Sequence, residues 1–238
     1  SLKELLSVIV KNDQLLLTAI AMTLFMIGYM TTTSFGLYFF KYAYGDESMY
    51  SVFAIILGLS QISALIIFPV LSKFFVRQKI YTASIIMVLA GYTIFFFAPT
   101  NTMLFIGISG VLIFVGQAFI QLMMLMFLAD CVDYGHWKLG KRNDSISFSL
   151  QPFINKLSGA VSNGIVSAVV IISGIKEATS AADVSAGGLL MMKIFPPLCI
   201  VASYILYRVR YKIDENMYQR VLAELEERGE LTRDSKNA

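Results

Sequence analysis

The stretch MLFIGISGVLIFVGQAFIQLMMLMFLA, residues 103–129, decides the fold because it contains no charged side chain. A helix needs about 20 mainly apolar residues to cross the hydrocarbon core of a bilayer, and this stretch is longer than that. In lipid, a helix satisfies its backbone hydrogen bonds within the segment itself. Residues 103–129 are therefore expected to span a membrane as a helix.

Further apolar runs lie on both sides of this stretch, separated by short polar or turn-forming segments. They cover residues 15–40, 50–71, 80–97, 147–172 and 189–207. The sequence thus predicts an all-α membrane protein with a six-helix domain over residues 14–210. Residues 1–13 are expected to form an amphipathic cytoplasmic segment, and residues 211–238 a charged, helical cytoplasmic tail.

The composition of the whole chain also indicates a polytopic membrane protein. Of its 238 residues, 57% are hydrophobic and 15% are charged, and the mean hydropathy is +0.69, whereas soluble domains carry about 25% charged residues. The net charge of +3 is small and the basic residues are dispersed, so nucleic-acid binding is not expected. No metal-ligand spacing surrounds Cys131 or Cys199, so neither a metal site nor a bound cofactor is expected.

Lysine and arginine are distributed unevenly among the segments that connect the spans. They are concentrated before the first span, in segments 72–79 and 130–144, and after the sixth span. The other connections contain only Lys41 and Lys176, with Lys193 just inside the sixth span. The sequence therefore predicts a multi-pass protein of the cell membrane. By the positive-inside rule, both of its termini are expected in the cytoplasm.

The fifth span, residues 147–172, differs from the others because it carries many polar side chains at helical spacing. One stripe holds Ser145, Ser149, Pro152, Lys156, Gly159 and Asn163, and a neighbouring stripe holds Gln151, Asn155, Ser158 and Ser162. A lysine within a span costs about 2.5–3.5 kcal/mol on insertion scales. Lys156 is therefore expected to face a water-filled cavity or a carboxylate, the alternative being snorkelling or a structural ion pair.

Four amides are candidates for binding a hydroxyl-rich substrate. Gln117 and Gln121 lie four residues apart and share one face of the fourth span. They can bind a sugar or tie helices together. Gln151 and Asn155 belong to the polar face of the fifth span.

The segment 130–144 is predicted to be a charged loop between the fourth and fifth spans. Its candidate gate residues are Asp130, Asp133, Tyr134, Lys138, Arg142 and Asp144. Charges at the ends of spans can pair with a facing domain and separate when that domain moves, although a solvated loop would also carry them. His136 is interpreted as a loop residue, with a role in proton coupling as the alternative.

Several strings in this region resemble the glycoside–pentoside–hexuronide:cation symporter family of the major facilitator superfamily, which includes melibiose permease. They are ADCVDYGHWK at 129–138 and KRNDSISFSLQ at 141–151, followed by Lys156 and Gly159, with KNDQL at 11–15 resembling the start of that family's seventh helix. The resemblance implies the C-terminal half of a twelve-helix transporter, whose partners are the N-terminal six-helix half, a small glycoside and membrane lipid. It also implies symport of a glycoside such as a galactoside with Na⁺, Li⁺ or H⁺ by alternating access.

The resemblance assigns roles to individual positions. Lys156 matches the family's lysine near the cation site, and Asp130, Asp133 and Arg142 match its cytoplasmic charged network. Gln121 stands where melibiose permease has a tryptophan that lines the sugar pocket.

Two alternatives fit the same six spans. A lysolipid or drug carrier of the superfamily would open an apolar cleft to lipid, whereas Asn, Gln and Ser on the fifth span favour a hydroxyl-rich ligand. A self-contained six-span homodimeric protein, such as a sensor or channel, would need no preceding half. An enzyme is not expected because the sequence contains no catalytic elbow, phosphate-binding loop or paired carboxylates.

Overall fold

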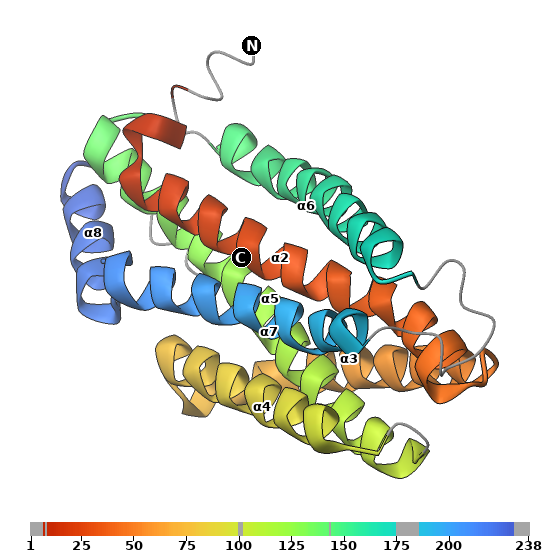
Figure 1. Ribbon diagram of the computed structural model, residues 1–238. Coiled ribbons are helices and arrows are strands. Elements are labelled where there is room, and N and C mark those ends of the chain that lie inside the picture. The colour runs from red at the N-terminus through yellow and green to blue at the C-terminus, as the bar shows by residue number, and fades with distance from the viewer. Residues whose placement is uncertain (1–6, 8, 100–101, 143, 175–185, 231–238) are drawn as a thin grey trace.

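The structure, a computed structural model, describes residues 7, 9–99, 102–142, 144–174 and 186–230, without the side chains of residues 144–148 and 186. The longer helices are α2 (Asp13–Tyr38), α3 (Met49–Phe74), α4 (Arg77–Phe97), α5 (Met103–Leu139), α6 (Asp144–Ile172), α7 (Ala186–Arg210) and α8 (Glu215–Glu227) (Figure 1). A π-helical segment, η1 (Phe39–Tyr44), continues directly from α2. Within the described residues, six helical segments are long and apolar enough to cross a membrane. The predicted all-α membrane fold is confirmed.

Helix α5 is the central element of the bundle. It packs along α4 and also contacts α2, α3 and α8, while α2 packs against α6 and α7 (Figure 1). In the most apolar part of each helix, 61% of α5 is buried within the chain, but only 11% of α3. Large side chains such as Phe25, Tyr81, Phe114 and Met123 fill the core around α5. Most of α3 is therefore left for lipid or another protein surface.

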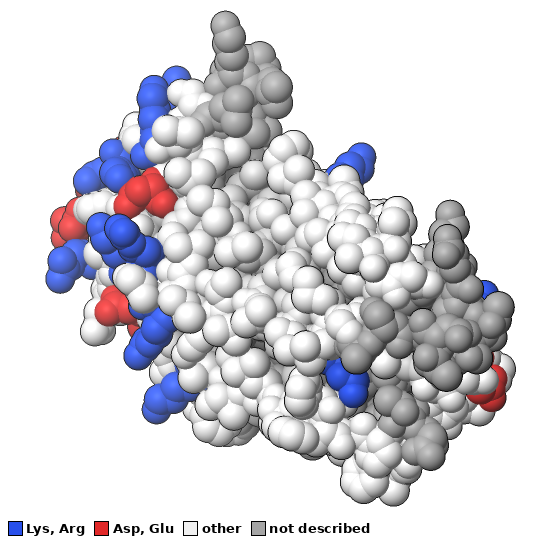
Figure 2. Space-filling view, in the orientation of Figure 1, with Lys and Arg blue, Asp and Glu red and all other residues white. Residues whose placement is uncertain are grey.

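Charged side chains gather at one end of the bundle, as Figure 2 shows, while the middle is mostly uncharged. This charged end comprises residues 11–14, 73–79, 130–142 and 208–230. The opposite end comprises residues 39–49, 97–99, 102–103 and 172–174. The described parts of the first and last segments of the chain both lie at the charged end.

The expected loop over residues 130–144 is wrong for most of its length, because α5 continues to Leu139. No proline interrupts this part of the helix. Its one internal glycine, Gly135, leaves room for the Asn12 side chain, because a Cβ at this position would lie only 2.4 Å from the Asn12 amide nitrogen. The helix ends only at Gly140, whose φ of +67° is a left-handed C-terminal cap. His136 is consequently a buried helix residue, 8% exposed, and not a loop residue.

Helices α4 and α5 approach each other closely at Gly91 of α4 and Gly116 of α5. This close approach predicts how a larger side chain would affect stability. A Cβ at Gly116 would lie 2.6 Å from a methyl of Val88 and 2.9 Å from the Ser84 carbonyl oxygen. Gly116→Ala is therefore expected to lower the free energy of unfolding by about 1–3 kcal/mol. Thermal unfolding of the detergent-purified protein measures this loss.

Gly107→Ala is the matched control, because its Cβ would meet only an Ile56 methyl at 3.6 Å. Both substitutions gain the same helix propensity, so the difference between them reports the close packing. Equal melting temperatures for the two variants would contradict this description of the α4–α5 contact.

Candidate functional site

The polar side chains of α6 divide into an inward and an outward set. Ser158 and Ser162 are both fully buried against α2. The Ser162 hydroxyl lies 2.9 Å from the Thr31 hydroxyl, and the Ser158 hydroxyl donates to the Thr23 carbonyl at 3.3 Å. These two serines therefore tie α6 to α2 and are not available to a substrate.

The outward set lies on the surface of the bundle. Lys156 and Asn163 are exposed, and Gln151 and Asn155 are half-buried beside them. Among the residues that the structure describes, no ion pair involves Lys156. The lysine thus points away from its own six-helix domain, toward whatever covers this face.

The two glutamines of α5 are in different environments. Gln121 is half-buried, whereas Gln117 is only 1% exposed. Neither amide atom of Gln117 makes a hydrogen bond of ordinary geometry within the described residues, although the amide lies near the Tyr92 hydroxyl. The structure therefore leaves Gln121 accessible together with the α6 amides, and places Gln117 in the interior.

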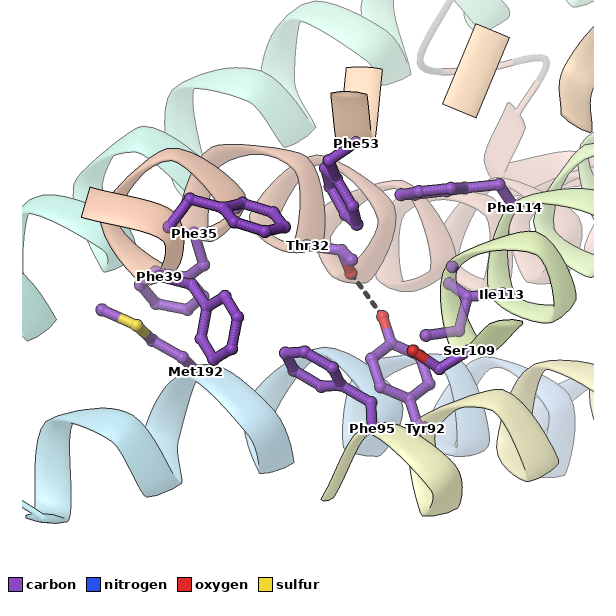
Figure 3. A pocket seen from close by; sticks show the side chains of 13 residues that line it. Thr32, Phe35, Phe39, Phe53, Tyr92, Phe95, Ser109, Ile113, Phe114 and Met192 are labelled. Atoms are coloured by element: carbon purple, nitrogen blue, oxygen red, sulfur yellow. Dashed lines mark hydrogen bonds between the residues drawn. The ribbon is translucent and has the colours of Figure 1, made fainter. Parts of the chain in front are cut away.

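An aromatic pocket near the opposite end is too small for a sugar. Figure 3 shows phenyl rings around a gap in which the Thr32 and Tyr92 hydroxyls bond to each other. The cavity has a volume of only about 30 Å³, whereas ligand pockets occupy about 300–1,000 Å³. This pocket is a packing void between helices.

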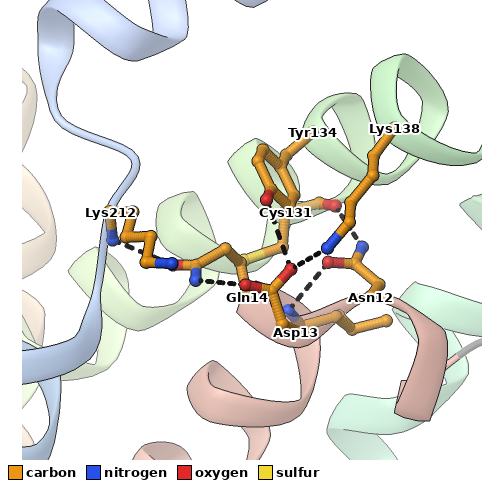
Figure 4. A network of polar contacts seen from close by, with 8 residues as sticks. Asn12, Asp13, Gln14, Cys131, Tyr134, Lys138 and Lys212 are labelled. Atoms are coloured by element: carbon orange, nitrogen blue, oxygen red, sulfur yellow. Dashed lines mark hydrogen bonds and ion pairs between the residues drawn. The ribbon is translucent and has the colours of Figure 1, made fainter.

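The first polar network at the charged end fixes the beginning of α2 (Figure 4). Asp13 accepts hydrogen bonds from Lys138 at 2.5 Å and Tyr134 at 3.2 Å. Asn12 caps α2 through its bond from the Leu15 N–H at 3.1 Å and donates to the Cys131 carbonyl at 2.8 Å. These contacts join α2 to the last turns of α5.

Gln14 extends this network to the segment after α7. Its side-chain oxygen accepts a hydrogen bond from the backbone N–H of Lys212 at 2.9 Å, and its amide donates to Asp13 at 3.0 Å (Figure 4). None of the site residues predicted from the sequence is Asn12, Asp13 or Gln14. The sequence did contain a signal for them, because Asp13 is an acidic residue in the first turn of a span and directly follows the capping residue Asn12.

The second network centres on two aspartates of α5. Arg77 at the start of α4 donates to both oxygens of Asp130, at 2.6 and 2.8 Å, and Asp130 is only 5% exposed. Arg142 pairs with Asp133 at 3.0 Å, and the Tyr218 hydroxyl donates to Asp133 at 3.2 Å. Burial and the nearby Asp133 carboxylate raise the pKa of Tyr218 to about 12, so Tyr218 remains a donor at neutral pH.

Five of the six gate candidates therefore have partners within this chain. Asp130, Asp133, Tyr134, Lys138 and Arg142 bond to α2, α4, α8 or to each other. The side chain of Asp144, the sixth candidate, lies outside the described residues. Arg77 and Tyr218, which complete the network, were not selected from the sequence because they are far from the α5 aspartates along the chain.

Helix α8 is held against the end of α5 by polar and apolar contacts. Trp137 donates to Glu224 at 2.5 Å, and the Nε2 atom of His136 lies 3.1 Å from a carboxylate oxygen of Glu230. Val221 and Leu225 of α8 are fully buried. The charged end is consequently one cross-linked unit of α2, α4, α5 and α8.

The sequence of this chain is similar to those of known sugar transporters. A family model described as MFS/sugar transport protein matches residues 1–215. The raffinose carrier protein of Pediococcus pentosaceus is 33% identical over 227 residues, which cover 94% of this chain and 35% of that protein. The lactose permease of Leuconostoc lactis is 29% identical over 230 residues, which cover 95% of this chain and 36% of that protein.

A more distant relative is named for a different substrate. The putative sulfoquinovose importer of Escherichia coli is 23% identical over 222 residues, covering 92% of this chain and 47% of that protein. This chain spans about a third of the length of the raffinose carrier and the lactose permease. The matched family is one of transporters and not of enzymes. With a family match over most of its length, and six helices in its described part that are long and apolar enough to cross a membrane, this multi-pass membrane chain belongs to the MFS/sugar transport protein family.

Proposed function

We propose that this chain is the C-terminal half of a cation-coupled sugar symporter. The transporter would move a glycoside, such as a galactoside, together with Na⁺, Li⁺ or H⁺ by alternating access. The observation that carries the proposal is the exposed Lys156 on the outward polar face of α6. The raffinose carrier and lactose permeases among the relatives support a sugar as the substrate.

The position of Lys156 argues for a second protein surface against α6. Lys156 lies about 10 Å along the helix axis from Ser149 at the start of the apolar segment, given a rise of about 1.5 Å per residue. At this depth an ammonium in lipid is unfavourable, and such residues face a bundle interior or water. Transporters built from two repeats bind substrate and cation between the repeats. An N-terminal half that covers this face would supply a carboxylate to Lys156 and a cavity for the sugar.

Gln121, Gln151 and Asn155 are assigned to the sugar. All three are accessible at least in part, and an amide offers both a donor and an acceptor to a hydroxyl group. Gln117 is assigned an indirect role, because its buried amide lies in the interior near Tyr92.

The charged end is assigned to the cytoplasm, since it holds most of the lysines and arginines. The gate residues Asp130, Asp133, Tyr134, Lys138 and Arg142 would act by holding this end together as one rigid body. The whole end could then close against the other half or move away from it, as in rigid-body domain movements.

Uptake in cells that express the transporter containing this chain tests the substrate class. We expect accumulation of labelled lactose or raffinose, competition between the two sugars, and loss of accumulation when the ion gradients are collapsed. Transport of a lysolipid or a drug without any sugar uptake would contradict the proposal and favour the alternative carrier.

A further inference from the structure

The connection between α3 and α4 has a surface that is unusual for a water-exposed turn. Phe74, Phe75 and Val76 are consecutive and are 77%, 53% and 48% exposed. Exposed apolar residues in such a run are unfavourable in water, but they are stabilised in the interfacial layer of a bilayer. Lys73 and Lys79 flank them. The turn therefore fits the depth of the lipid headgroups at the charged end.

An apolar groove leads from this turn along α4 toward the middle of the bundle. Its volume is about 360 Å³, and it is lined by Leu71, Phe75, Lys79, Ile80, Ala83, Ser84, Met87 and Phe119. Lys79 is the only charged residue of this lining. The Ser84 hydroxyl donates to the Ile80 carbonyl at 2.7 Å within the same helix, so it is already satisfied. The groove is thus an apolar surface depression with one positively charged group, the Lys79 ammonium, at its end.

Two lysines at this turn, Lys73 and Lys79, form no ion pair with the described acidic residues, although Asp130, Asp214 and Glu215 lie near the neighbouring Arg77. The first turn of α4 contains no acidic residue. Arg77 is neutralised by Asp130, whereas no ion pair of the described residues involves Lys73 or Lys79. An anionic headgroup complements this charge, while the amine of a zwitterionic headgroup would offset part of the attraction.

We propose that this groove binds one anionic phospholipid from the leaflet at the charged end. The phosphate lies at Lys79, with Lys73 close enough in sequence to add to the positive field. The first part of an acyl chain lies along α4 over Ala83 and Met87, with Phe119 of α5 lining the groove. Basic pockets between spanning helices at the cytoplasmic side are a recurrent form of lipid recognition.

Native mass spectrometry of the delipidated, detergent-purified transporter tests this site by titration with phosphatidylglycerol or phosphatidylcholine. The unmodified protein is expected to retain phosphatidylglycerol at lower lipid concentration than phosphatidylcholine. Lys79→Gln should weaken retention of the first bound phosphatidylglycerol by about tenfold, which corresponds to 1.4 kcal/mol, and Lys79→Arg should restore it. Lys212→Gln is the control, because it removes an exposed lysine from the same end without altering the groove.

A second variant tests the groove separately from its charge. Ala83 is exposed in the groove, so Ala83→Phe fills the space without displacing core residues and should also weaken retention. Melting temperatures of all variants show whether the fold is intact. Equal retention of the two lipids by the unmodified protein, or unchanged phosphatidylglycerol retention in both Lys79→Gln and Ala83→Phe, would overturn the proposal. A loss in Lys212→Gln equal to that in Lys79→Gln would overturn it too, since it would indicate only general attraction to positive charge.

Discussion

Lys156→Gln is expected to abolish accumulation of sugar against its gradient, leaving equal concentrations on the two sides of the membrane. The reason is that Lys156 is exposed on α6 without a partner among the described residues, and we propose that it meets the coupling site between two halves. Glutamine retains length and hydrogen-bonding capacity but loses the positive charge. Labelled-sugar uptake in energised cells gives the accumulation ratio directly.

Lys193→Gln is the control for that experiment. Lys193 also lies in a span, but its ammonium donates to the Phe96 carbonyl at 3.3 Å and lies over the rings of Phe95 and Phe96. It is therefore engaged within this chain and should not affect coupling. If Lys156→Gln accumulated sugar as well as the wild type does, this would contradict the proposed role of Lys156 in coupling. Since Lys156 packs against no acid among the described residues, Lys156→Gln is expected to melt like the wild type.

Arg77→Met is expected to produce the largest loss of stability. Asp130 is only 5% exposed, and both of its carboxylate oxygens accept hydrogen bonds from Arg77. Removing one member of a buried pair leaves an uncompensated charge and costs about 3–5 kcal/mol. For a protein of this size, the melting temperature should fall on the order of 10 °C. Thermal unfolding of the purified protein measures the change.

Two further variants isolate the cause of this loss. Lys138→Gln breaks an ion pair whose side chains are 38% and 42% exposed, so it should cost at most about 1 kcal/mol. In the double variant Arg77→Met, Asp130→Leu no charge is left unpaired, and much of the stability should return. Equal destabilisation by Arg77→Met and Lys138→Gln, or no recovery in the double variant, would show that the buried charge is not responsible.

The spans were predictable because apolar length alone determines whether a helix can cross a bilayer. The boundary between α5 and the following loop was not predictable in the same way. Residues from Asp130 onward are polar enough for a loop, and only their contacts with α2 and α8 show why they remain helical. Gly140 was the available stop signal, ten residues later than the change in polarity.

The two polar stripes of α6 show a similar limit for the candidate site. Helical spacing groups the residues correctly, but it does not determine which stripe faces the domain interior. Thr31 and the Thr23 carbonyl on α2 are the partners that draw Ser162 and Ser158 inward, which leaves Lys156 outside. Likewise, the pairing of Asp13 with Lys138 joins residues 125 positions apart. Such contacts follow from tertiary packing and leave no local pattern.

The central claim, coupling of sugar to a cation, is tested most directly by cation movement that a sugar drives. The transporter containing this chain would be reconstituted in proteoliposomes without ion gradients, and lactose or raffinose would be added outside. We predict that Na⁺, Li⁺ or H⁺ enters with the sugar, and that Lys156→Gln abolishes this entry. Sugar uptake by the wild-type protein with no accompanying cation would contradict the account.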